Sequence, residues 1–225
     1  MDSTRLPGKI LSLLDSTNTS LSYTINQLRK CKSLDKIVIA TTINAEDDII
    51  KNFAKKNKID VFRGDSDDVL SRYYHCAKHY SLSSILRVTG DCPLIDPIIV
   101  EKGISIFLKN TYDYVTNTFP RTFPDGNEIE IFSFSALELA YKNAILPSER
   151  EHVTPYFHNN KEKFKIHNFS HDENISHLRW TLDYGADLKL IKILISKIQT
   201  RPIHMTNILE ILKNEPDLIK INQAH

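Results

Sequence analysis

Short apolar stretches alternate with amphipathic helical patterns along the first half of the chain. Residues 36–41 and 84–88 are compact runs rich in β-branched residues, which is typical of buried strands. Residues 45–56 carry acidic side chains in the first turn of a helical pattern. The elements expected in this half are helices at 21–33, 45–56, 66–80 and 97–108, and strands at 36–41, 59–62, 84–88 and 112–117. Such alternation predicts an α/β fold with a mostly parallel sheet and helices on both of its faces.

The pattern changes after residue 117. The expected strands are 128–134, 164–169 and 178–182, and the expected helices are 135–144, 148–158, 185–198 and 205–213. Ser66 is the expected N-cap of the helix at 66–80, and Asp96 that of the helix that begins with Pro97. We therefore expect one domain over residues 1–225, with a mixed sheet in its second half, 118–225.

Composition narrows the classes of function. The 225 residues carry a formal net charge of +1, which argues against the clustered basic surface that nucleic-acid binding needs. No apolar run approaches the ~20 residues that span a bilayer, so no membrane association is expected. The cysteines, Cys31, Cys76 and Cys92, are odd in number and scattered, which favours a reducing cytoplasm over a disulfide framework.

The opening segment, Ser3 to Lys9, gathers a hydroxyl group and two cations, Arg5 and Lys9, around a Pro-Gly turn. A loop with these groups can bind a polyphosphate, although it is not a P-loop. The competing interpretation is a solvated chain end, which composition alone favours.

Two aspartates follow expected strands. Asp91 lies in the segment Thr89–Pro97 after the strand at 84–88, and Asp183 follows the strand at 178–182. Ligands of open α/β sheets bind at the carboxyl ends of strands, where two carboxylates can share one Mg²⁺ ion. Each aspartate alone is equally typical of a turn or a helix cap.

A run of charged residues, Ser148 to His152, belongs to an expected helix. Arg150 can grip a carboxylate with two hydrogen bonds, which would suit a role in sugar binding. A solvated helix face is the commoner explanation of such a run.

Several segments together resemble one enzyme family, the sugar cytidylyltransferases, and within it the branch of spore coat polysaccharide biosynthesis protein F. The segments occur in the family's order over nearly the whole chain: Ser3–Lys9, Val38–Thr42, Val61–Gly64, Asp67–Tyr73, Thr89–Pro97, Glu149–Tyr156 and Arg179–Asp183. The resemblance implies a Rossmann-like fold of the nucleotide-diphosphosugar-transferase (GT-A-like) type. It also implies a Mg²⁺-dependent enzyme that transfers CMP from CTP to an acidic sugar, releases pyrophosphate and forms a homodimer.

The resemblance also assigns roles to residues by their position. Ser3, Arg5 and Lys9 would hold the triphosphate, with Arg5 and Lys9 as the catalytic cations. The nucleotide pocket would be lined by Arg63, Gly64, Asp68 and Arg72, and Mg²⁺ would bind Asp91 and Asp183. The sugar would be faced by Glu130, Arg150 and His152.

One departure from the family lies at the start of the sequence. In the family the phosphate loop follows a buried central strand, and Met1 aligns just after that strand. We therefore expect the sheet to lack its first central strand, which would leave the neighbouring strands unpaired. Two other functions stay open: a GT-A-type glycosyltransferase, although the Asp-x-Asp motif of that class is absent after Asp91, and a truncated paralogue that binds nucleotide without turnover.

Overall fold

The computed structural model describes residues 6–223. Ser3 and Arg5 lie outside this range. The strands are β1 (Val38–Thr42), β2 (Asp60–Gly64), β3 (Ser84–Arg87), β4 (Tyr114–Thr116), β5 (Glu130–Ser133) and β6 (Ile166–Asn168). The α-helices are α1 (Ser20–Leu28), α2 (Asp48–Lys56), α3 (Val69–His79), α4 (Pro97–Lys109), α5 (Phe134–Asn143), α6 (Pro147–His152), α7 (Pro155–Asn159), α8 (Gly185–Lys197) and α9 (Met205–Asn214). Short 3₁₀ helices are η1 (Lys9–Leu11), η2 (Ala45–Asp47), η3 (Lys161–Lys163) and η4 (Pro216–Ile221).

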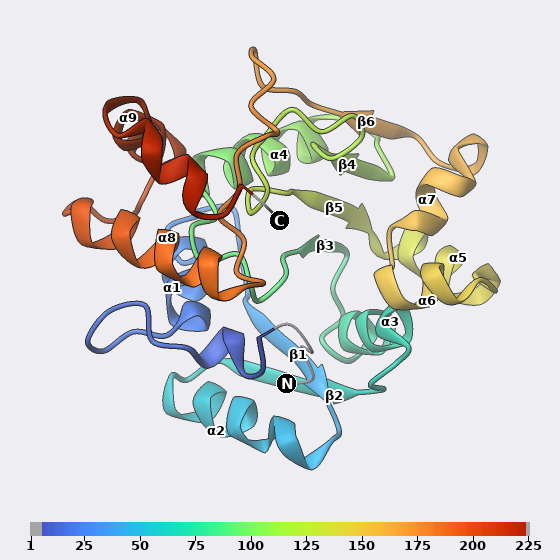
Figure 1. The fold of residues 1–225 in the computed structure, drawn as a ribbon. Coiled ribbons are helices and arrows are strands. Elements are labelled where there is room, and N and C mark those ends of the chain that lie inside the picture. The colour runs from blue at the N-terminus through green and yellow to red at the C-terminus, as the bar shows by residue number, and fades with distance from the viewer. Residues whose placement is uncertain (1–5, 224–225) are drawn as a thin grey trace.

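The strands form two separate sheets (Figure 1). β1 and β2 pair in parallel, whereas the second sheet has the order β3-β5-β4-β6, with β5 antiparallel to both of its neighbours and β4 parallel to β6. Within residues 6–223, β1 pairs only with β2, and β3 pairs only with β5. One edge of β1 and one edge of β3 are thus unpaired within the described part of the chain. The predicted α/β class with a mixed second half is confirmed.

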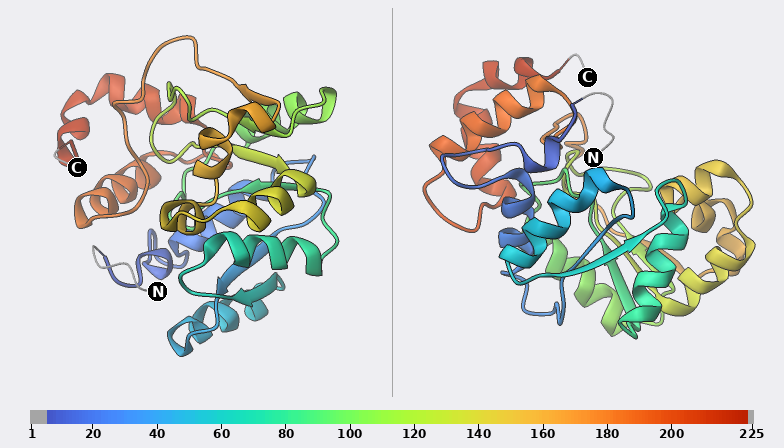
Figure 2. Two further views of the ribbon diagram at one scale, coloured as in Figure 1. Left: turned by 90° about the vertical axis from the view of Figure 1, so that its right-hand side faces the viewer. Right: turned by 90° about the horizontal axis from the view of Figure 1, so that it is seen from below.

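Alternating side chains bury both faces of the second sheet. Tyr114 and Phe132 pack into one core with residues of α3, α5 and α7. Val115 and Ile131 point the other way, into a larger core with residues of α4, α8 and α9. Figures 1 and 2 show α8 and α9 on one side of the molecule and α5, α6 and α7 on the opposite side. No helix within residues 6–223 is long and apolar enough to cross a bilayer.

The predicted strand at 178–182 is wrong. This segment is extended, but its backbone pairs with a loop: Asp125 donates its N–H to the carbonyl of Leu178 at 2.9 Å, and Trp180 donates to the carbonyl of Asp125 at 2.9 Å. The pattern of alternating apolar residues therefore reflects burial on one face and not membership of a sheet. Trp180 is fully buried in the larger core.

Helix boundaries differ from the prediction where local chemistry is specific. The helix expected at 148–158 is divided into α6 and α7, because Val153 adopts a left-handed φ of 72° and Pro155 has no N–H to donate to the preceding turn. Asp68, and not Ser66, is the N-cap of α3, since its carboxylate accepts the N–H of the first turn. The predicted cap of α4, Asp96, is confirmed. The helix predicted at 21–33 ends earlier, at Leu28.

Gly126 is required where the 124–126 loop meets the extended segment. Its φ is +105°, and a Cβ placed there would lie 2.9 Å from the Thr181 nitrogen and 3.0 Å from the Trp180 carbonyl carbon. We expect Gly126→Ala to lower the free energy of unfolding by about 2–4 kcal/mol, because both the backbone angle and the contact are unfavourable. Gly185→Ala is the matched control, since nothing lies within 4 Å of a Cβ at that position. Urea unfolding of both variants checks this, and equal stabilities would contradict the role of Gly126.

Candidate active site

Three charged residues from distant parts of the chain meet at one point. The Lys9 ammonium lies 2.5 Å from Oδ2 of Asp91 and 2.6 Å from Oδ1 of Asp183. Lys9 begins η1, Asp91 follows β3, and Asp183 precedes α8. The two aspartate segments are tied together by their backbones, because the Leu182 N–H donates to the Asp91 carbonyl at 2.8 Å. The structure thus brings together the two carboxylates that the sequence singled out.

The two negative charges of Asp91 and Asp183 favour a cation between them. The Lys9, Asp91 and Asp183 side chains are 14%, 22% and 14% exposed, so water screens them only partly. Burial alone would lower the pKa of Lys9, but the two carboxylates outweigh it and raise the pKa above its usual value. Lys9 is therefore charged at neutral pH, and its ammonium stands where the oxygens of Asp91 and Asp183 converge.

The donor set fits a magnesium ion. Both aspartates offer hard carboxylate oxygens to one point, where the ammonium now provides the positive charge. Within residues 6–223, no group of three or more His, Cys, Asp or Glu side chains is arranged to hold a metal. Mg²⁺ suits such a site because it commonly binds one or two carboxylates and completes its shell with waters and substrate phosphates.

Further charged side chains surround Asp183. Arg179 forms ion pairs with Asp183 at 2.8 Å and with Asp187 at 3.2 Å, and it also pairs with Asp125. Asp187 is fully buried and accepts the backbone N–H groups of Asp183 and Tyr184, both at 2.9 Å. Arg179 belongs to a segment that resembles the family, whereas Asp125 and Asp187 were not predicted for the site. Nothing in the sequence alone distinguishes these two aspartates from acidic residues of the surface.

The residues predicted for the nucleotide pocket surround the ends of β1 and β2. Arg63 donates to the carbonyls of Thr42 at 2.8 Å and Asn44 at 2.7 Å, so it holds the turn after β1. The absence of a side chain at Gly64 leaves room for the Arg72 side chain. A Cβ at position 64 would lie 3.0 Å from the Arg72 Cγ. Arg72 donates to the carbonyl of Asp65, and within residues 6–223 its buried Nε has no hydrogen-bond partner.

The structure joins one residue predicted for the nucleotide to one predicted for the sugar. Arg150 in α6 pairs with Asp68 at the start of α3, with its Nε at 2.9 Å, and it also donates to the carbonyl of Tyr141 at 2.8 Å. His152, at the end of α6, is exposed. The three residues do not contact Lys9, Asp91 or Asp183 in any hydrogen bond or ion pair found within the described chain.

Glu130, also predicted for the sugar, is buried at the start of β5. Its carboxylate accepts the Tyr114 hydroxyl at 2.9 Å and pairs with Arg87 at 2.5 Å. Among the described residues, the buried Nε of Arg87 has no hydrogen-bond partner. The Arg87–Glu130 pair forms a polar centre at the carboxyl end of β3.

A carboxyl group with a shifted pKa lies in the loop that carries Asp125. Burial and the neighbouring Asp125 carboxylate raise the pKa of Glu128 to about 7. Glu128 accepts the Gly126 N–H at 2.7 Å and lies 3.4 Å from the guanidinium of Arg121. The loop next to Arg179 therefore gains negative charge as the pH rises towards neutrality.

Comparison with known proteins gives consistent results. The family model described as Cytidylyltransferase matches residues 1–218. Spore coat polysaccharide biosynthesis protein SpsF of Bacillus subtilis is 31% identical over 232 residues, which cover 100% of this chain and 95% of that protein. The structure of a cytidylyltransferase from Leptospira borgpetersenii superposes with a TM-score of 0.92 at 38% identity and covers 96% of this chain and 92% of that one.

A more distant structure shares the fold. CMP:2-keto-3-deoxy-manno-octonic acid synthetase, solved with CTP, has a TM-score of 0.64 at 14% identity and covers 87% of this chain and 94% of that one. The Rossmann-like nucleotidyltransferase fold expected from the sequence is thereby confirmed.

The Glu128 pKa predicts a pH-dependent stability. The pKa of Glu128 is about 7 in the folded protein and 4.5 in the unfolded chain. Its contribution to the free energy of unfolding is therefore highest below pH 4.5, and that contribution falls as the pH rises through about 7. We expect Glu128→Gln to raise the free energy of unfolding by about 1–2 kcal/mol at pH 8 and to change it little at pH 4.5. Thermal unfolding at both pH values checks this, with the exposed Glu162→Gln as control. An equal effect at both pH values would contradict it.

The Lys9 contacts predict competition between this ammonium and a divalent cation. We expect Mn²⁺ to bind Lys9→Met about tenfold more tightly than the natural protein in the absence of nucleotide, because a charge-assisted hydrogen bond is worth about 1.5 kcal/mol. Electron paramagnetic resonance of free Mn²⁺ measures the affinity. Lys36→Met, which removes a pair with Asp60 outside this cluster, is the control. Unchanged or weaker binding by Lys9→Met would show that the ammonium does not occupy the cation position.

Proposed function

Because the chain belongs to the cytidylyltransferase family, we propose that it transfers CMP from CTP to an acidic sugar and releases pyrophosphate. The observation that carries this proposal is the convergence of Lys9, Asp91 and Asp183. The acidic sugar is suggested by the synthetase of CMP:2-keto-3-deoxy-manno-octonic acid, which shares the fold. A role in polysaccharide synthesis is suggested by the Bacillus relative.

In the proposed reaction a sugar hydroxyl attacks the α-phosphorus of CTP. The new P–O bond forms as the bond to the β-phosphate oxygen breaks, and the hydroxyl proton passes to solvent. Such transfers depend mainly on positioning and on neutralising the charge of the leaving group. Asp91 and Asp183 would hold Mg²⁺, which supplies positive charge to the phosphate oxygens when it is bound.

The residues of this chain have distinct tasks in that scheme. Lys9 turns its ammonium from the aspartates to the phosphates, so that one anionic partner replaces another. The Leu182–Asp91 backbone hydrogen bond keeps the two carboxylates together while Lys9 moves. Arg179 stays paired with Asp183 and limits the repulsion between that carboxylate and Asp91.

The other predicted contacts stay proposals. Ser3 and Arg5 would add to the triphosphate site, with Arg5 beside Lys9 as a catalytic cation. The nucleotide would contact Arg63, Gly64, Asp68 and Arg72, and the sugar would contact Glu130, Arg150 and His152. Arg150 is suited to a sugar carboxylate because it already binds a carboxylate, that of Asp68. The homodimer, the cytoplasmic location and the division of one domain at residue 117 also stay predictions.

The two alternative functions make different predictions. A GT-A-type glycosyltransferase would consume a nucleotide sugar and release no pyrophosphate. A paralogue without turnover would bind CTP and release nothing. The family match over residues 1–218 favours the cytidylyltransferase over the glycosyltransferase.

A pyrophosphate-release assay tests the proposed function. The protein is incubated with Mg²⁺, each nucleoside triphosphate in turn, and a panel of nonulosonic and octulosonic acids. We expect release with CTP and one class of acid only. Failure with every combination, while calorimetry shows that CTP binds, would identify the protein as a binding paralogue.

Removal of one proposed metal ligand tests the site. We expect Asp91→Asn to lower the rate by at least about 100-fold, the scale of losing one preorganised charge contact, while circular dichroism shows a retained fold. Asp35→Asn, an exposed aspartate, is the control and keeps full activity. An Asp91→Asn variant with full activity at ordinary Mg²⁺ concentration would remove Asp91 from the site.

A further inference from the structure

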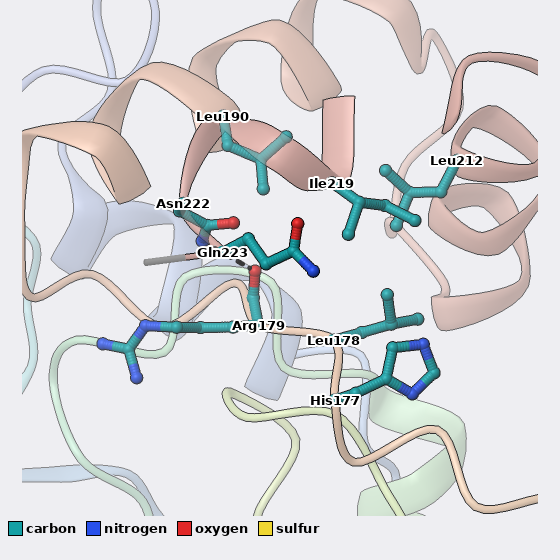
Figure 3. A pocket seen from close by; sticks show the side chains of 8 residues that line it. All are labelled: His177, Leu178, Arg179, Leu190, Leu212, Ile219, Asn222 and Gln223. Atoms are coloured by element: carbon teal, nitrogen blue, oxygen red, sulfur yellow. Dashed lines mark hydrogen bonds between the residues drawn. The ribbon is translucent and has the colours of Figure 1, made fainter. Parts of the chain in front are cut away.

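Asn222 lies near the end of the chain, directly after η4, and contacts the charge network of the site. Its side chain is buried, with a relative exposure of 5%. The amide nitrogen donates to the carbonyl of Arg179 at 3.1 Å and to Oδ1 of Asp187 at 2.8 Å. Figure 3 shows this amide beside the main chain of Arg179, while the Arg179 guanidinium points away from it. One amide group therefore fixes two neighbours of Asp183.

Asp187 is the next member of the chain of contacts. Its Oδ1 accepts from Asn222 and, at 3.2 Å, from the Nε of Arg179. Its Oδ2 accepts the backbone N–H of Asp183 at 2.9 Å. The orientation of the Asp187 carboxylate is thus set from both sides.

Arg179 completes the connection to the cation position. Its Nη2 donates to Oδ2 of Asp183 at 2.8 Å, which leaves Oδ1 directed at the Lys9 ammonium at 2.6 Å. The backbone of Asp183 is held by Asp187 and its side chain by Arg179. Outer-shell partners of this kind set the orientation of metal-binding carboxylates and tune metal affinity.

We propose that Asn222 is a positioning residue that sets the cation affinity of the Asp91–Asp183 pair through Asp187 and Arg179. The C-terminal segment after α9 thereby becomes part of the active-site support. The inference rests on the proposed function, because it takes Asp183 as a cation ligand. It adds a determinant far from the reacting groups, which neither the family segments nor the site contacts of Asp183 alone identify.

The surroundings of Asn222 leave room for water in place of its amide. A small cavity of about 60 Å³ lies beside it, and its lining combines the aliphatic Leu178, Leu190, Leu212 and Ile219 with the polar His177, Arg179 and Gln223 (Figure 3). A water molecule occupies about 30 Å³ in the liquid, so this space can admit water to the Asp187 carboxylate when the amide is absent. Water replaces the lost hydrogen bond but is not attached to the chain, so it does not fix the orientation of Asp187.

Binding of Mn²⁺ to the protein without nucleotide tests the proposal. We expect Asn222→Ala to weaken Mn²⁺ binding about 10-fold, the low end of the loss caused by outer-shell partners. Gln223→Ala is the matched control, because Gln223 lines the same cavity and is exposed. In steady-state assays with CTP, the Asn222→Ala variant should need more Mg²⁺ for half-maximal rate and reach the normal kcat once Mg²⁺ saturates.

The remaining outcomes each decide the question. Natural Mn²⁺ affinity in a folded Asn222→Ala protein would overturn the inference and leave the proposed function intact. If Asp183→Asn also leaves Mn²⁺ affinity unchanged, the metal site of the proposed function itself fails. Asn222→Ser keeps one hydrogen-bond donor and serves where the alanine variant does not fold. Loss of the fold in both variants would overturn the inference, because Asn222 would then be a residue of the core.

Discussion

The interaction on which this site depends is the ammonium of Lys9 between the carboxylates of Asp91 and Asp183. Two partly buried carboxylates this close repel each other unless a cation lies between them. The three residues come from the start, the middle and the end of the chain, so their meeting requires the folded core. The same charges that hold the segments together would also bind the substrates: Lys9 the polyphosphate, and the two aspartates its metal ion.

The backbone supplies the rigidity that this charge cluster needs. The loop that follows β3 and the segment that precedes α8 share a hydrogen bond from Leu182 to Asp91. The 124–126 loop packs against the same segment, with Gly126 allowing the close approach. Both aspartates are thus placed by main-chain contacts, and Asp183 is also oriented by Arg179 and Asp187.

Two of the cations predicted for the substrates already have anionic partners within the protein: Lys9 binds two aspartates, and Arg150 binds Asp68. Glu130, predicted for the sugar, is likewise paired with Arg87. When an anionic substrate binds at such a centre, it replaces the carboxylate as the partner of the cation. No unpaired cation is then left in a partly buried site. In the part of the chain that the structure describes, the buried Nε atoms of Arg72 and Arg87 have no hydrogen-bond partner, so each keeps a donor to offer.

Local patterns in the sequence predicted the α/β class and most helices and strands, and strand-end positions singled out the aspartates at 91 and 183. The pattern misled at 178–182, where burial on one face imitates a strand, and at 148–158, where Val153 and Pro155 divide a helix. Folding alone places Lys9 between the aspartates, Asp125 against Arg179 and Asn222 against Asp187. These contacts join residues far apart in the chain, and no local preference encodes which distant groups will meet.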